Sequence, residues 1–228
     1  PQHDFEDAFK VLDECIVTDV PLNGFNYPYM APGGAYGSNW WQLDGSLNVA
    51  GAKWTNQKFV EDIIRGFAEV QAQNPDGRID LWGGSTTRGQ VADVSSLPRY
   101  FEAAYDVFRR SDDSLLRDII FESMKKYLEY WFSSAKRDKT TGLITGVFEE
   151  SLSNISAEVG SLAPIDLNVA VAIGCYNTSR MGCSSAALKA CKKRAASVPS
   201  VTRWSAERVT CIRVPTANCP ASSTTGTR

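Results

Sequence analysis

Hydrophobic residues recur every three or four positions along most of the first 180 residues, which is the spacing of helices with one buried face. The clearest case is a single stripe formed by Phe59, Ile63, Phe67 and Val70. The same spacing predicts helices over residues 4–19, 43–53, 56–73, 95–111, 112–134 and 164–181. Long segments rich in glycine and proline separate most of these stretches. The pattern therefore predicts an all-α fold.

Two of the predicted helices, residues 43–53 and 164–181, carry almost no charge beyond their first turn. A helix that is apolar on all sides is normally buried on all sides. Alternation of such helices with amphipathic ones predicts an inner and an outer layer, with the connecting loops gathered at one end. The chain shows no strand–helix alternation of the kind that builds a doubly wound sheet. We therefore predict a two-layer helical toroid.

The composition excludes several classes of protein. The 228 residues are 43% hydrophobic, which is enough for the core of one ordinary domain or two small ones. A net charge of −2 argues against nucleic acid as a partner. No apolar run reaches the roughly 20 residues of a membrane helix, so no membrane partner is expected. Because the chain starts at Pro1 with no signal-peptide pattern, we expect a processed or partial chain and assign no location in the cell.

The end of the chain differs from the rest in charge and cysteine content. Residues 1–179 have a balance of −10, whereas residues 180–228 have a balance of +8 and contain four of the six cysteines. The cysteine spacing matches no disulfide framework, and a zinc site would lack CxxC pairs and nearby histidine, since His3 is the only one. Disulfides and zinc stay as alternatives to free thiols. We expect residues 181–228 to be poorly ordered or a non-native continuation.

Four segments of the chain resemble motifs of one enzyme family. They are PGGAYGSNWWQLDGSLNVAGAKW, DGRIDLWGG, FEESLSN and APIDLNVAVA, and they follow in this order between about residues 28 and 180. The chain thereby resembles the six-hairpin glycoside hydrolases, the group of trehalases, processing α-glucosidases and mannosylglycerate hydrolases. The resemblance implies an (α/α)6 toroid, with residues 1–180 as about half of the catalytic domain. It also implies hydrolysis of α-linked glucosides or mannosides with inversion.

The chain departs from the family pattern at several positions. Leu43 stands where trehalases have a tryptophan before the aspartate, and VSSLPR replaces their Arg-Ser-Gln-Pro-Pro segment, so trehalose is not the expected substrate. Asn154 occupies the position of the family's acidic aspartate. The family's general base comes from the far C-terminal part of the barrel, beyond the half that this chain resembles. We therefore expect the chain to be inactive by itself.

Inverting hydrolysis requires two carboxyl groups about 6.5–9.5 Å apart, one protonated and one ionised. Glu150 is the first candidate for the acid and Glu149 the second, because they are adjacent in a loop just before an apolar helix. Burial or a neighbouring carboxylate raises the pKa of a carboxyl group, as an acid catalyst requires. The alternative is that one of the two caps a helix or lies in solvent.

The predicted substrate-binding residues combine flat rings with groups that bind hydroxyls: Trp40, Trp41, Gln42, Asp44, Arg78, Trp82, Asp166 and Asn168. Indole faces cover the C–H surface of a sugar ring, and a carboxylate accepts hydrogen bonds from two neighbouring hydroxyls. The resemblance implies that Asp166 and Asn168 shape the sugar subsite. Structural alternatives stay open. Asp44 and Asp166 lie where a helix cap is favoured, Trp82 suits a loop anchor, and Arg78 suits a loop ion pair.

Two other hypotheses stay open. The first is a non-catalytic carbohydrate-binding helical toroid. The second is a helical interaction protein without a sugar site, in which Trp40, Trp41, Trp82 and Asp44 would scatter. None of the hypotheses requires a cofactor or a metal. Because an incomplete toroid exposes the apolar sides of its end helices, we also expect self-association through these faces.

Overall fold

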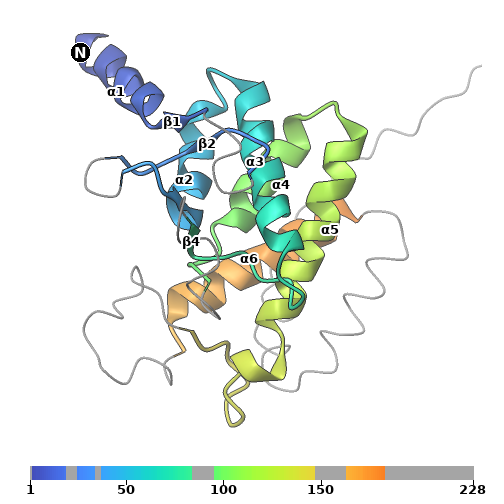
Figure 1. Cartoon of the computed structure of the whole chain (residues 1–228). Coiled ribbons are helices and arrows are strands. Elements are labelled where there is room, and N and C mark those ends of the chain that lie inside the picture. Colours follow the sequence, from blue (N-terminus) through green and yellow to red (C-terminus); the bar gives the residue numbers. More distant parts are fainter. Residues whose placement is uncertain (1, 19–24, 34–36, 84–94, 147–162, 183–228) are drawn as a thin grey trace, which may run out of the picture.

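The computed structural model describes residues 2–18, 25–33, 37–83, 95–146 and 163–182 (Figure 1). The described part is mostly helical and has few, short strands, in agreement with the predicted all-α class. Its helices are α1 (Gln2–Glu14), α2 (Gln42–Ala52), α3 (Gln57–Ala72), α4 (Tyr100–Arg110), α5 (Ser114–Trp131) and α6 (Ile165–Met181). A short 3₁₀ turn (Ser134–Lys136) follows α5. Each of the six predicted stretches overlaps one of these helices, and α1 and α2 begin two residues and one residue before the predicted starts.

Two helices begin at side-chain caps that can be recognised in the sequence. The Asn56 side chain accepts a hydrogen bond from the Phe59 amide at 3.0 Å at the start of α3. The Asp113 side chain accepts from the Leu116 amide at 3.0 Å at the start of α5. Such caps satisfy amide groups that have no partner within the helix. They explain why these two helices start within two residues of the predicted positions.

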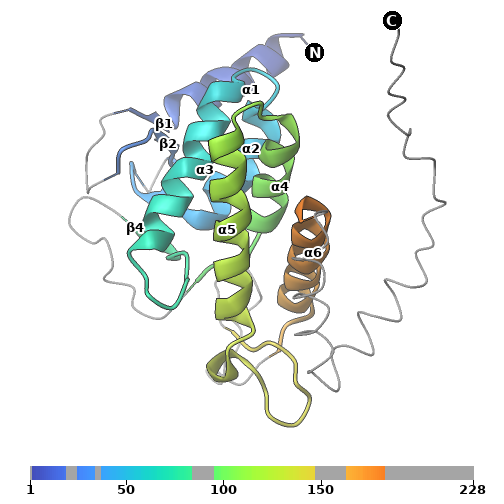
Figure 2. The same ribbon diagram turned by 90° about the vertical axis from the view of Figure 1, so that its right-hand side faces the viewer.

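The helices α2, α4 and α6 contact one another in turn, and α3 contacts α5 on the other side of them (Figures 1 and 2). The helices α2 and α4 run in the same direction. Their starts are joined by the Ser96 amide donating to the Gln42 side chain, and their ends by the ion pair of Lys53 with Asp106. Short connections make α2 with α3, and α4 with α5, helical hairpins.

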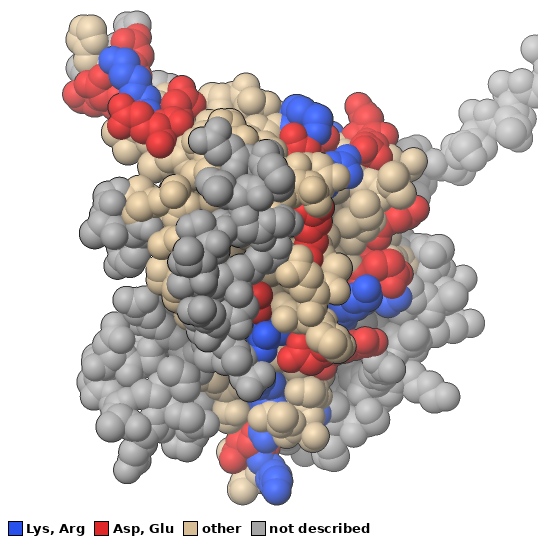
Figure 3. All heavy atoms as spheres, viewed as in Figure 1, with Lys and Arg blue, Asp and Glu red and all other residues tan. Residues whose placement is uncertain are grey.

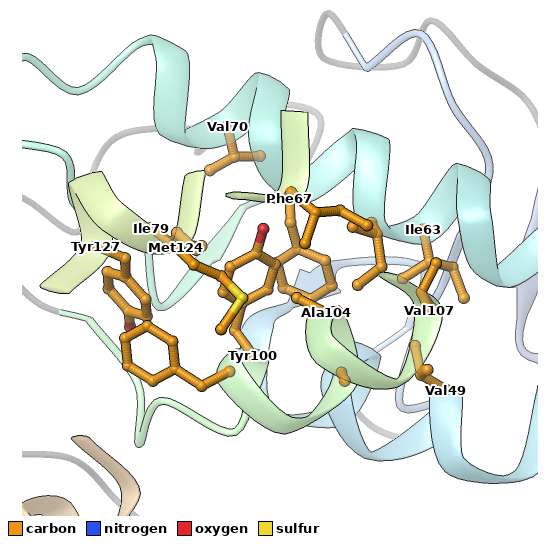
Figure 4. Close-up of a cluster of buried hydrophobic side chains, with 14 of the residues drawn as sticks. Val49, Ile63, Phe67, Val70, Ile79, Tyr100, Ala104, Val107, Met124 and Tyr127 are labelled. Atoms are coloured by element: carbon orange, nitrogen blue, oxygen red, sulfur yellow. The ribbon is translucent and has the colours of Figure 1, made fainter. Parts of the chain in front are cut away.

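A chain of aromatic rings fills the space between the two layers. Trp40 lies against Phe67, which lies against Tyr100, and Tyr100 lies against Tyr127, with ring centroids 5.1, 5.2 and 6.0 Å apart. Figure 4 shows part of this cluster, with apolar residues from α2, α3, α4 and α5 around the rings. Ring contacts of this kind add to the free energy of apolar burial. The cluster joins all of the helices from α2 to α5.

Helix α6 packs closely on α4 because a glycine faces an aromatic ring. A Cβ atom at Gly174 would lie 2.6 Å from the Phe101 ring. The Asn177 side chain adds a hydrogen bond to the Phe101 carbonyl at 3.4 Å. The absence of a side chain at position 174 therefore sets the distance between the two helices.

Two small antiparallel pairs of strands complete the described structure. β1 (Ile16–Val17) pairs with β2 (Tyr29–Met30), and β3 (Trp40–Trp41) pairs with β4 (Trp82–Gly83). The first pair corrects the predicted end of the first helix, residues 4–19. The helix ends at Glu14 because the backbone of Ile16 and Val17 bonds to β2 instead of continuing the helix.

The two helices that the sequence predicts as buried on all sides have one exposed face each. Leu47 of α2 is 53% exposed, and Ile165 and Val169 of α6 are 79% and 47% exposed. The described helices do not close into a ring, and α2 and α6 lie at the two edges of the row with α4 between them. None of the described helices combines the length and the apolar character needed to cross a bilayer.

Charged side chains of both signs are interspersed over the described part of the face shown in Figure 3. The exception is α1, over which acidic side chains gather. This helix carries five carboxylates and a single lysine, Lys10. Its apolar Val11 is 60% exposed, so α1 covers little of the core.

Candidate functional site

Two of the predicted sugar-binding tryptophans lie face to face. Antiparallel pairing of β3 with β4 places Trp41 directly opposite Trp82. The two indoles are stacked, with ring centroids 5.7 Å apart and planes 19° apart. Both side chains are partly exposed. Residues that are 41 positions apart in the sequence thus form one aromatic surface at the start of α2, which we call the tryptophan pair.

Trp40 points away from this surface. Successive side chains of a strand point to opposite sides, so Trp40 and Trp41 cannot both face a ligand on the same side. Trp40 is 1% exposed and lies against Phe25 and Phe67. Its indole is part of the core and offers no surface on which a sugar ring could lie. We therefore remove Trp40 from the candidate ligand contacts.

Gln42 is fully buried and is also removed from the ligand contacts. Its Nε2 donates to the Tyr127 hydroxyl at 2.8 Å. Its Oε1 accepts from the Ser95 hydroxyl at 3.1 Å and from the Ser96 amide at 3.0 Å. Burial raises the pKa of Tyr127 to about 12, so the phenol stays protonated at neutral pH. The Gln42 carboxamide thus makes its hydrogen bonds to other groups of the protein.

Asp44 lies in the first turn of α2, three residues after Trp41, and is partly exposed. It is not the cap of this helix, because Trp41 holds that position and makes no side-chain cap bond. A carboxylate in the first turn is still favoured by the partial positive charge of a helix start. The geometry leaves Asp44 on the same end of α2 as the tryptophan pair.

Arg78 is buried, and its guanidinium donates hydrogen bonds to neighbouring loop residues. Its Nε donates to Asp80 Oδ1 at 3.0 Å, and its Nη2 donates to Asn74 Oδ1 at 3.0 Å. Burial alone would lower the pKa of Arg78, but the charge and hydrogen bond of Asp80 outweigh it and raise the pKa further above its already high value. Arg78 therefore forms the loop ion pair that was the structural alternative.

Asp166 and Asn168 lie at the start of α6, after the N-cap residue Pro164. Asp166 Oδ1 accepts from the Leu167 amide at 2.8 Å, so the carboxylate serves the first turn without being the cap. Asn168 accepts from the Ile144 amide and donates to the Ile144 carbonyl, both at 3.0 Å. The Asn168 carboxamide thereby holds the segment around Ile144 against α6, and its hydrogen bonds are made to groups of the protein itself.

Glu149 and Glu150 lie outside the described residues, so their prediction as catalytic acids stays a prediction. The described residues contain no group of three or more histidine, cysteine, aspartate or glutamate side chains that could hold a metal. A groove of about 370 Å³ lies between α2 and α4, lined by Leu47, Lys53, Glu102, Tyr105 and Asp106 among others. None of the predicted binding residues lines this groove.

The hydrogen-bond partners of Gln42 and Arg78 are not among the residues predicted for the site. Ser95 and Tyr127 hold Gln42, and Asp80 holds Arg78. Asp80 stands two positions from Arg78, a spacing that could have suggested the ion pair. Tyr127 is 85 positions from Gln42, and no local pattern indicates that the two meet.

Comparison of the chain with models of known protein families finds no match. Comparison with curated proteins finds none either.

Proposed function

We propose that this protein is carbohydrate-active and binds α-linked glucosides or mannosides at the tryptophan pair. The observation that carries the proposal is the stacking of Trp41 on Trp82 at the start of α2, whose first turn contains Asp44. An exposed indole face is complementary to the C–H face of a sugar, and a carboxylate binds neighbouring hydroxyls. This combination of groups is the chemistry that the sequence motifs predicted for the site.

We propose further that the fold is part of an (α/α)6 toroid of the six-hairpin glycoside hydrolase type. Three features of the described part support this. The helices alternate between two layers, α2 and α4 run in the same direction, and the tryptophan pair lies at the N-terminal end of α2. The exposed apolar residues of α2 and α6 fit helices that need further neighbours.

The reaction proposed for a complete site is hydrolysis with inversion. Glu150, or Glu149 in second place, donates a proton to the leaving oxygen, and a carboxylate outside this half of the barrel activates water. The alternative is a non-catalytic carbohydrate-binding protein. The described residues bear on sugar binding alone, because Glu149 and Glu150 lie outside them.

Calorimetric titration of the chain with p-nitrophenyl α-glucoside and p-nitrophenyl α-mannoside tests the binding proposal. Trp82→Ala removes one indole of the pair and should weaken binding about tenfold, the equivalent of about 1.4 kcal/mol. Trp54→Ala is the matched control, since Trp54 is 71% exposed at the opposite end of α2. Binding that is absent in the wild type, or equally strong in both variants, refutes a sugar site at the tryptophan pair.

Release of p-nitrophenol from the same glycosides separates the two forms of the proposal. Saturable binding without release supports the binding protein. The acid is tested with an α-linked glucose disaccharide, whose alkoxide leaving group must be protonated, unlike p-nitrophenolate. Glucose release that disappears in Glu150→Gln, with binding retained, supports Glu150 as the acid, whereas release that is unchanged in both Glu150→Gln and Glu149→Gln rules out both residues.

A further inference from the structure

We propose that Gln42 is the positioning residue of the tryptophan pair, acting through the buried side chains of Ser95 and Tyr127. The part of this inference that concerns the sugar rests on the proposed function, whereas the part that concerns the arrangement of the two indoles does not. It replaces the predicted role of Gln42 as a residue that touches the sugar.

Gln42 is joined to both strands that carry the tryptophans. It follows Trp41 directly in the chain, and its own amide donates to the Leu81 carbonyl at 3.0 Å, one residue before Trp82. A shift of Gln42 therefore moves the backbone next to Trp41 and the backbone next to Trp82 together. No other described residue combines a covalent bond to Trp41 with a hydrogen bond to the residue before Trp82.

The Gln42 side chain is in turn fixed from three directions. Its Nε2 donates to Tyr127 on α5, and its Oε1 accepts from the hydroxyl of Ser95 and the amide of Ser96. The Ser95 hydroxyl lies 2.5 Å from that of Tyr127 and 2.6 Å from the Ile79 carbonyl, and its single proton is shared between that carbonyl and Gln42 Oε1. The carboxamide and the two hydroxyls thus form a closed set of hydrogen bonds away from water.

Such a set is sensitive to the loss of any member. A buried polar group that loses its partner has no water to replace it, so the remaining members must move to find new partners. The movement available here is of the segments that carry Trp41 and Trp82, because Tyr127 is held in the aromatic core between Tyr100 and Trp131. We therefore expect disruption of the set to disturb the stacking of the two indoles.

The chain offers a matched control for this expectation. Tyr100 and Tyr127 are both fully buried, their rings are in contact, and both hydroxyls are hydrogen-bonded. The Tyr100 hydroxyl lies 2.7 Å from that of Ser123 and belongs to no bond of Gln42. Tyr127→Phe and Tyr100→Phe thus remove the same atom from similar surroundings, but only the first touches the set around Gln42.

Circular dichroism of the tryptophan transitions reads the geometry without any ligand. Two stacked indoles couple their transitions and produce a signed couplet, which Trp82→Phe should abolish and thereby identify. We expect Gln42→Met and Tyr127→Phe to lose most of this couplet and to bind the p-nitrophenyl glycosides about tenfold more weakly. Tyr100→Phe should keep both the couplet and the glycoside affinity, although the loss of its hydrogen bond lowers the thermal unfolding midpoint.

A couplet that falls no further in Gln42→Met and Tyr127→Phe than in Tyr100→Phe overturns the proposal and leaves a purely structural network. If Gln42→Met does not fold, Tyr127→Phe alone decides the question. A wild type that binds neither glycoside refutes the proposed function and the ligand part of this inference, whereas the circular dichroism still decides whether Gln42 positions the tryptophans.

Discussion

The buried ion pair of Arg78 gives the sharpest prediction of stability. Arg78→Leu removes a guanidinium that satisfies Asp80, which is 6% exposed, and Asn74. Loss of one partner of a buried pair costs about 3–5 kcal/mol, because the other charge is left without compensation. Asp76 beside the pair is half-exposed, so water can reach one side of it. We therefore expect the lower end of this range, about 3 kcal/mol.

For a domain of this size, about 3 kcal/mol corresponds to a fall of roughly 6–12 °C in the unfolding midpoint. Urea denaturation monitored by circular dichroism measures the free energy of unfolding directly. The double variant Arg78→Leu with Asp80→Leu should be less destabilised than Arg78→Leu alone, because it leaves no isolated buried carboxylate at position 80. A cost below about 1 kcal/mol for Arg78→Leu, or a double variant that shows the sum of the two single costs, would refute this account.

Three further predictions concern other parts of the fold. Gly174→Ala places a methyl group 2.6 Å from the Phe101 ring. After the gain in helix propensity, it should lower the free energy of unfolding, measured in urea, by about 1–2 kcal/mol. Gly51→Ala is the control and should be neutral or stabilising, because the nearest neighbour of a Cβ atom there is 3.9 Å away. Burial alone would raise the pKa of Asp106, but Lys53 and Arg110 lower it below its usual value. The stability that these ion pairs contribute is therefore complete above the unfolded pKa of about 3.9 and is lost as the pH falls through the lowered folded-state pKa. Asp106→Asn should accordingly be less stable than the wild type at neutral pH and approach it in acid; urea midpoints that stay equally far apart at all pH values contradict this. Leu47→Glu and Val169→Glu place charge on the exposed faces of α2 and α6 and should reduce self-association in sedimentation experiments. Leu115→Glu is the control, since Leu115 is 65% exposed on α5, and an equal effect in all three variants would argue against these faces as the contact.

The positions of the helices could be predicted from the sequence because helix formation depends on local spacing. The predicted helix over residues 56–73 is α3 (Gln57–Ala72), and the one over residues 112–134 is α5 (Ser114–Trp131). Both have a recurring apolar face and a capping side chain at the start, which are signals within a few residues of one another. The first helix was predicted five residues too long at its end, since the pairing of β1 with β2 is not a local signal.

The candidate site could be predicted only in part. The region around Trp41, Asp44 and Trp82 was identified from residue type, and the structure brings the two tryptophans together. Which residue of the pair Trp40 and Trp41 would face the core was not predictable, because both are equally apolar. The alternation of side chains along β3 decides it, and the pairing of β3 with β4 exists only in the folded chain.

The sequence by itself determined where along the chain the helices lie, which positions in them are apolar, and where aromatic and acidic residues gather between helices. These properties follow from the order of side chains along a few turns of chain. The tertiary structure alone decided that Gln42 is held by Tyr127 and that Arg78 is held by Asp80 and Asn74. A polar side chain binds a ligand or the protein according to which groups lie next to it after folding. For Gln42 those groups come from positions 53 to 85 residues away.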